Sequence, residues 1–229
     1  MINNKRILAV IPARYGSRRL KQKNLLKINN KSLIELAFNS AKKSKYIDRT
    51  VVSTENKIIK KSCEKFDKDA VISRPKSLSQ DNTKSEKVLI DVIKKIGKDF
   101  YYIILLQPTS PLRTTQDIDK ALRKIDKNKF DNLVSICVTS QINSYYISST
   151  QNLLIKKKKI NVKKKNFKVN GAIYICKKKN FLKEKTFFSK KTGFIKMPKL
   201  RSIDIDYRED FIKAKKLIEN DFKGRKNYN

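Results

Sequence analysis

Residues 7–28 read ILAVIPARYGSRRLKQKNLLKI, and this stretch decides how the chain is interpreted. An apolar run stops at Pro12, as a buried strand does, and the next twelve residues hold three arginines and two lysines. Open α/β sheets bind their ligands just past the carboxyl ends of the strands. The cationic loop at residues 13–24 therefore predicts an anionic ligand, with a solvated basic loop as the alternative that composition leaves open.

The rest of the chain alternates short apolar runs with amphipathic stretches. We expect strands over 6–13, 49–54, 69–74, 100–107, 132–140 and 169–178, and helices over 31–44, 55–66, 84–96, 115–128 and 207–220. Strand and helix in turn predict an α/β protein with an open, largely parallel sheet. The run at 100–107 is continuously apolar, which favours a central strand covered on both faces.

The alternation breaks after residue 140. We expect a single domain over 1–222, with an inserted small lobe at about 139–195, a return to the main domain at 196–222, and a basic tail at 223–229.

Composition limits the class of protein. The 229 residues include 56 Lys and Arg against 21 Asp and Glu, a net charge of +35. The lysines occur nearly everywhere, whereas a nucleic-acid reader more often gathers its charge on one element. A lysine-rich nucleic-acid-binding protein remains the alternative from another class, and a salt-titrated gel shift discriminates it. No apolar run approaches the roughly 20 residues of a membrane span, and three scattered cysteines predict reduced thiols, hence a cytoplasmic protein.

The chain contains no histidine. A general base must therefore be a carboxylate, a lysine, a tyrosine, a cysteine or a metal-bound group.

A second motif, LLQPTSPLR, covers residues 105–113. Gln107 follows the expected central strand and carries both a donor and an acceptor, so it could bind a base or a sugar edge. A well-capped connection between strand and helix is the alternative.

A third motif, SIDIDYREDF, covers residues 202–211. Strand alternation would place Asp204 and Asp206 on one face, where paired carboxylates suit Mg²⁺. Asp206 and Glu209 could instead cap the following helix. Together with the cationic loop, the acidic pair indicates metal-assisted phosphoryl or nucleotidyl transfer.

Four motifs in order, IPARYGSRRLKQKNL, LLQPTSPLR, VNGAIYI and SIDIDYREDF, resemble the acylneuraminate cytidylyltransferases, the CMP-sialic acid synthetases, over about residues 6–220. The enzymes that activate the eight-carbon acid Kdo also begin with a PARYGS-R stretch, but they usually differ at Lys23-Asn24 and lack LLQPTSPLR. A Kdo cytidylyltransferase is the alternative enzyme. The resemblance implies a Rossmann-like nucleotidyltransferase fold, three-layered α/β/α with a mostly parallel, mixed sheet and a small dimerisation lobe.

The resemblance also implies the reaction: CTP and a nonulosonic acid give a CMP-sugar and pyrophosphate, with Mg²⁺, or Mn²⁺ in its place. Catalytic roles fall to Arg14, Lys23 and Asp206, and metal binding to Asp204 and Asp206. The implied nucleotide-binding residues are Ala13, Arg14, Gly16, Ser17, Lys23, Asn24 and Ser85, and the implied acid-binding residues are Gln107, Lys168, Asn170, Tyr174, Phe187 and Phe188. The two phenylalanines would line the pocket across a homodimer interface, with ordinary lobe core as their alternative.

One segment departs from the family pattern. Residues 155–168 read IKKKKINVKKKNFK, short and almost entirely lysine, with Lys168 where relatives carry an arginine. Lysine can pair with a carboxylate but not in a bidentate way. The acid therefore stays open among N-acetylneuraminic, pseudaminic, legionaminic and other nonulosonic acids, and an inactive homologue is a further possibility.

Overall fold

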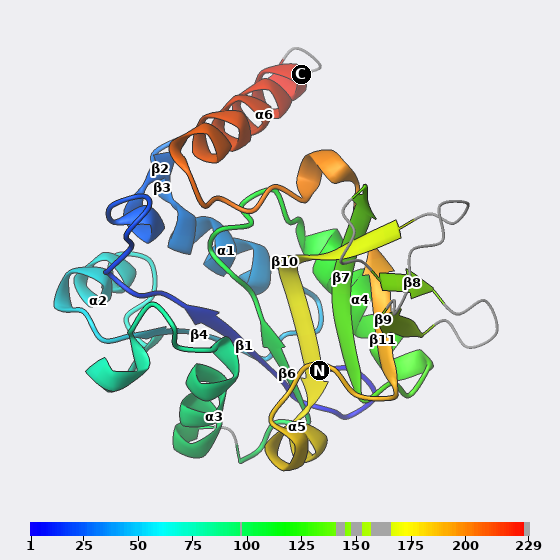
Figure 1. The fold of residues 1–229 in the computed structure, drawn as a ribbon. Helices are drawn as coiled ribbons and strands as arrows, with labels where there is room; N and C mark the ends of the chain where they lie inside the picture. Colours follow the sequence, from blue (N-terminus) through cyan, green and yellow to red (C-terminus); the bar gives the residue numbers. More distant parts are fainter. Residues whose placement is uncertain (97, 141–144, 148–152, 157–165, 227–229) are drawn as a thin grey trace.

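The computed structural model describes residues 1–96, 98–140, 145–147, 153–156 and 166–226 (Figure 1). A mixed sheet forms its centre, with the strand order β11-β7-β10-β6-β1-β4-β5. These strands are β1 (Ile7–Pro12), β4 (Arg49–Thr54), β5 (Val71–Ser73), β6 (Tyr102–Leu105), β7 (Asn132–Thr139), β10 (Asn166–Lys177) and β11 (Thr192–Lys196).

The sheet is largely parallel. β1 runs parallel to β4 and β6, β4 to β5, and β11 to β7, while β10 is antiparallel to both of its neighbours. β6 is central and all four of its residues are buried, as expected, although it is shorter than the apolar run that predicted it. The α/β class and the mostly parallel sheet are confirmed.

Helices cover both faces of this sheet, as the two main hydrophobic clusters show. The first cluster joins one face of β1 to α1 (Leu33–Lys42), α2 (Lys57–Glu64) and α4 (Thr115–Lys127). The second joins the other face to α3 (Ser85–Ile96) and α5 (Lys178–Glu184). Successive residues of β1 alternate between the two clusters, which is why the whole strand reads as apolar.

The remaining elements are short, apart from α6 (Arg208–Lys226), which extends away from the sheet in Figure 1. They are the 3₁₀ turns η1 (Lys23–Leu25), η2 (Lys76–Leu78) and η3 (Lys199–Arg201) and the strands β2 (Lys27–Ile28), β3 (Lys31–Ser32), β8 (Tyr145–Ile147) and β9 (Leu154–Lys156). In the part of the chain that the structure describes, no helix combines the length and apolar character needed to cross a membrane.

Residues 202–206 do not form the strand that alternation predicted, and this expectation is wrong. The segment is anchored by a backbone bond from the Ile205 amide to the Thr109 carbonyl, 2.8 Å long. Ile205 is fully buried in a small cluster with Ile28 and Leu33. The alternation of buried and open side chains thus survives without a strand.

Part of the segment expected as an inserted lobe belongs to the main sheet. β10 lies between β7 and β6, and β11 pairs with β7. The described hairpin of β8 and β9 joins β10 through one pair, Phe167 with Tyr145. A separate lobe remains a prediction, and most of the lysine-rich run lies outside the described residues.

Candidate active site

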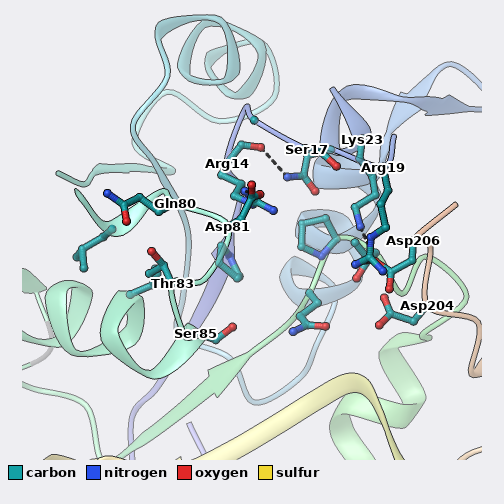
Figure 2. Close-up of a pocket in the computed structure, with 18 of the residues that line it drawn as sticks. Arg14, Ser17, Arg19, Lys23, Gln80, Asp81, Thr83, Ser85, Asp204 and Asp206 are labelled. Atoms are coloured by element: carbon teal, nitrogen blue, oxygen red, sulfur yellow. Dashed lines mark hydrogen bonds and ion pairs between the residues drawn. The ribbon is translucent and has the colours of Figure 1, made fainter. Parts of the chain in front are cut away.

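A cavity of about 270 Å³ opens at the carboxyl ends of β1 and β6 (Figure 2). Because these strands are parallel, the loops that follow them meet at this edge. The cavity is lined by Pro12, Arg14, Gly16, Ser17, Arg19, Lys23, Asn24, Arg74, Leu78, Gln80, Asp81, Thr83, Ser85, Val88, Gln107, Pro108, Thr109, Asp204 and Asp206. The cationic loop, the LLQPTSPLR motif and the SIDIDYREDF motif therefore contribute to one site, whereas VNGAIYI is not among the lining segments.

The cationic loop after β1 is held by its own side chains and by two carboxylates. Lys23 Nζ and Arg19 Nη2 each lie 3.0 Å from Asp206 Oδ1. Arg14 and Arg18 both pair with Asp81. Four cations of this loop thus share two carboxylates, so this cluster of side chains carries more positive than negative charge.

Asn24 supports the same loop through its backbone: the Asn24 side chain bonds a main-chain carbonyl of the loop. Its side chain is 7% exposed, and its Nδ2 donates a 2.8 Å hydrogen bond to the Arg14 carbonyl. Asn24 therefore fixes the backbone of Arg14, while its direct contact with a nucleotide remains a prediction.

Asp204 and Asp206 open onto the cavity from the segment before α6. The pKa of the Asp204 carboxyl is raised, because the surrounding protein displaces water from it and the Asp206 charge repels it, while Thr109 and Lys23 oppose the shift. A bound cation would relieve that cost, and two carboxylates are hard oxygen ligands. The pair fits Mg²⁺ in chemistry, although the described residues hold no cluster of three or more metal-ligating side chains.

The cap proposed for Asp206 and Glu209 is not what the structure shows. The amides of Asp206 and Tyr207 both donate to Asp210 Oδ2, at 3.1 and 2.9 Å. The Asp206 carboxylate instead receives Lys23 and Arg19. Its place beside the cationic loop therefore favours a role in the site.

Gln107 and Asp204 both approach Gly171. Gly171 has a φ of +78°, and a Cβ atom there would lie 2.9 Å from Gln107 Oε1 and 3.4 Å from Asp204 Oδ2. Arg113 Nη1 fixes the underlying backbone, since it donates to the carbonyls of Gln107 and Ala172 at 3.0 and 2.9 Å. Burial lowers the pKa of Arg113 to about 10, so its guanidinium stays charged at neutral pH.

The opposite wall of the cavity comes from the segment between β5 and α3. Ser85, at the start of α3, was predicted, but Arg74, Gln80, Asp81 and Thr83 were not assigned a role. Arg74 directly follows a strand of the parallel sheet, so the rule that located the first loop could also have found it.

Nine of the predicted site residues line the cavity, and six do not. The nine are Arg14, Gly16, Ser17, Lys23, Asn24, Ser85, Gln107, Asp204 and Asp206. The other six are Ala13, Lys168, Asn170, Tyr174, Phe187 and Phe188. Ala13 is fully buried beneath the loop, where its amide donates to the Ser53 carbonyl at 2.9 Å.

Asn170 has a structural role. Its Oδ1 accepts from Ser135 Oγ at 2.5 Å, and its Nδ2 donates to Ser202 Oγ at 2.8 Å. The residue is 5% exposed and lies where the register of β10 against β7 shifts. Asn170 thus fixes the bulge that presents Gly171, while direct contact with a ligand remains a prediction.

Phe187 and Phe188 were expected to line a pocket across a dimer interface, and the burial of Phe187 favours the core alternative for that residue. Phe187 is 2% exposed, with its ring 5.0 Å from those of both Tyr174 and Phe181. Phe187 is therefore a core residue, the alternative considered for it. Phe188 is 39% exposed, and its contribution to a partner's pocket remains a prediction.

Two curated relatives are similar to this chain over most of its length. An N-acylneuraminate cytidylyltransferase of Streptococcus agalactiae is 31% identical over 214 residues, which cover 90% of this chain but 51% of that protein, so the chain spans about half its length. A CMP-N,N'-diacetyllegionaminic acid synthase of Legionella pneumophila is 32% identical over 225 residues, covering 93% of this chain and 97% of that protein.

A solved structure shows the same fold. A CMP:2-keto-3-deoxy-manno-octonic acid synthetase complexed with CTP has a TM-score of 0.79 and 17% identity, covering 95% of this chain and 100% of the other. The family model described as Cytidylyltransferase matches residues 8–226. Since that match takes in the cationic loop, Gln107 and both aspartates, the chain belongs to the cytidylyltransferase family and is a nucleotidyltransferase.

Proposed function

We propose that this protein transfers the cytidylyl group of CTP to a nonulosonic acid and releases pyrophosphate. The observation that carries the proposal is the meeting of the cationic loop with Asp204 and Asp206 in one cavity, beside Gln107. A surplus of positive charge suits a triphosphate, and the neutral amide of Gln107 suits the hydroxyl groups of a sugar.

The side chains divide the work by charge. Arg14 and Lys23 hold the triphosphate and stabilise the negative charge that develops on the pyrophosphate leaving group. The anomeric hydroxyl of the acid attacks the α-phosphorus in line: one oxygen–phosphorus bond forms, the bond to pyrophosphate breaks, and the hydroxyl proton passes to solvent water. Gln107 and the backbone at Gly171 position the acid for that attack.

Asp204 and Asp206 would hold Mg²⁺. Mg²⁺ supplies charge neutralisation at the phosphate oxygens when it is bound. Lys23 already contacts Asp206, so the loop and the aspartate pair would act on the same phosphates.

The relatives' names leave the acid undecided among an N-acylneuraminate, a legionaminic-type acid and pseudaminic acid. A panel of N-acetylneuraminic, legionaminic, pseudaminic and Kdo acids, with CTP and UTP compared, tests the proposal by pyrophosphate release. Release with CTP and one nonulosonic acid supports it. Pyrophosphate release with Kdo alone would assign the alternative enzyme. If none of the acids in the panel supports pyrophosphate release, the proposed function is refuted.

A homodimer belongs to the same proposal. Phe188 is partly exposed, and its ring would reach the partner's pocket. Light scattering at assay concentration is expected to give twice the monomer mass, and a fully active monomer would contradict the proposal.

A further inference from the structure

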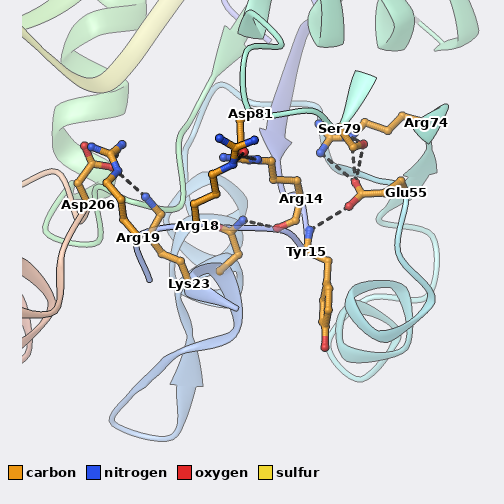
Figure 3. Close-up of polar contacts among 11 residues, drawn as sticks. Arg14, Tyr15, Arg18, Arg19, Lys23, Glu55, Arg74, Ser79, Asp81 and Asp206 are labelled. Carbon is orange, nitrogen blue, oxygen red and sulfur yellow. Dashed lines mark hydrogen bonds and ion pairs between the residues drawn. The ribbon is translucent and has the colours of Figure 1, made fainter. Parts of the chain in front are cut away.

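Glu55 joins three segments of the chain that are far apart in sequence. It is the first residue after β4, and its carboxylate accepts the Tyr15 amide at 2.9 Å, Ser79 Oγ at 2.8 Å, and Arg74 Nε and Nη2 at 3.2 and 3.0 Å (Figure 3). The side chains of Glu55 and Arg74 are 12% and 3% exposed. The two side chains thus form a largely buried ion pair, in which Arg74 lines the cavity and Glu55 lies behind it.

The partners of Glu55 belong to the two walls of that cavity. Tyr15 lies between Arg14 and Gly16, both of which line the cavity from the cationic loop. Arg74 lines the opposite wall, and Ser79 precedes Gln80 of the same wall. One carboxylate therefore sets the spacing between the walls, although Glu55 is not among the residues that line the cavity.

The charge of Glu55 is what holds this arrangement. Burial alone would raise the pKa of Glu55, but hydrogen bonds from the Tyr15 amide, Ser79 and Arg74 lower it overall, so the carboxylate is ionised at neutral pH. Burial lowers the pKa of Arg74, and Glu55 opposes that shift. Removal of one partner of such a pair leaves the other as an uncompensated buried charge.

We propose that Glu55 is a positioning residue that holds the loops at 13–24 and 75–84 at the separation that CTP requires. This inference rests on the proposed function for the identity of the nucleotide. Without Glu55 the cations of both walls remain present but lose their fixed spacing, so nucleotide affinity falls while the phosphate-binding side chains are unchanged.

The test compares Glu55→Gln with Asp126→Asn, a matched control. Asp126 is also a buried carboxylate, 7% exposed, and accepts Lys5 Nζ at 2.5 Å and Tyr102 Oη at 3.0 Å. Lys5 precedes β1 and Tyr102 begins β6, so this cluster lies at the opposite edge of the sheet from the cavity. Both substitutions should destabilise the protein, but only Glu55→Gln should disturb the site.

Two readouts separate positioning from general loss of stability. Hydrogen exchange should accelerate in both loops, 13–24 and 75–84, in Glu55→Gln and in neither loop in Asp126→Asn. Calorimetry should show CTP affinity at least tenfold weaker in Glu55→Gln and unchanged in Asp126→Asn. Equal exchange and equal CTP affinity in wild type and Glu55→Gln, or the same losses in both variants, would overturn the inference.

A third variant separates the contact of Glu55 with Arg74 from its contact with the Tyr15 amide. Glu55→Asp keeps the charge but is one methylene shorter, so it should retain Arg74 and lose the Tyr15 amide. Hydrogen exchange should then rise in the loop at 13–24 while the loop at 75–84 stays protected. A rise in neither loop would contradict the inference that Glu55 holds the two loops together. If the wild type binds no CTP, the proposed function fails, and the exchange data alone still decide whether Glu55 joins the loops.

Discussion

Gly171→Ala tests whether the close approach of Gln107, Gly171 and Asp204 is needed for catalysis. The new Cβ atom would lie 2.9 Å from Gln107 Oε1, a distance that requires one group to move, and 3.4 Å from Asp204 Oδ2. The end of the Gln107 side chain can move most easily, so it should leave its place in the cavity. The φ of +78° adds backbone strain, which for an L-residue is about 1–2 kcal/mol.

These contributions predict separate effects on stability and activity. For a chain of this size, about 1–2 kcal/mol corresponds to a fall in Tm of about 2 to 8 °C. Loss of one hydrogen bond from Gln107 to the acid, about 1 kcal/mol, should lower kcat/KM for the acid roughly fivefold. The KM for CTP should stay unchanged, because the cationic loop is not displaced.

The assay is pyrophosphate release with the acid varied at saturating CTP, beside thermal unfolding. Gly16→Ala is the control for stability, since a Cβ atom there meets nothing within 4 Å. A cycle with Gln107→Ala completes the design: if Gly171→Ala acts through Gln107, the double variant should be little less active than Gln107→Ala alone. Wild-type activity and Tm in Gly171→Ala would refute the reasoning.

Three further predictions concern the charged residues. Lys23→Ala should lower turnover by about two to three powers of ten, the effect of losing one preorganised donor, and near-normal pyrophosphate release would remove the loop from the chemistry. Asp206→Asn should abolish most activity but cost less than about 1 kcal/mol in unfolding free energy, because its ion pairs are partly exposed; EDTA should reproduce the loss in wild type, and full activity of the variant would contradict a metal role. Asp204→Asn should be inactive yet at least as stable as wild type without ligands at neutral pH, and a large fall in Tm would show that its carboxylate stabilises the fold.

The sequence predicted the fold well where burial alone decides the local structure. β1 and β6 are apolar throughout because helices cover both faces of the sheet. The helices that alternate with the strands along the chain imply parallel pairing. The antiparallel β10 and its bulge were not predictable in this way. They depend on contacts of Asn170 with Ser135 and Ser202, which are 35 and 32 residues away.

The candidate site was predicted where a motif follows a strand, and missed where function depends on contacts between distant residues. Arg14, Lys23, Gln107 and the aspartate pair belong to compact motifs. Glu55 has no such motif: its role appears only when Tyr15, 40 residues earlier, and Arg74, 19 residues later, are brought to the same carboxylate. The prediction that Phe187 lines a pocket across a dimer interface is disfavoured for a related reason, because exposure cannot be inferred from aromatic character alone.

The pKa values of two acidic residues beside the cavity, Glu55 and Asp204, are shifted in opposite directions, and these directions fit the proposed roles of the two residues. The lowered pKa of Glu55 means that its ionised form stabilises the fold above the ordinary Glu pKa, and that this contribution is lost as the pH falls through the lowered value. The raised pKa of Asp204 means the reverse: its contribution is present below the ordinary Asp pKa and is lost as the pH rises through the raised value. At neutral pH the protein is therefore stabilised by the carboxylate that joins its loops and destabilised by the one that faces the cavity. A carboxylate whose charge the protein compensates poorly gains most from a bound cation. If the proposed metal binds, we therefore expect Asp204 to contribute more to its affinity than Asp206, whose charge Lys23 and Arg19 already balance.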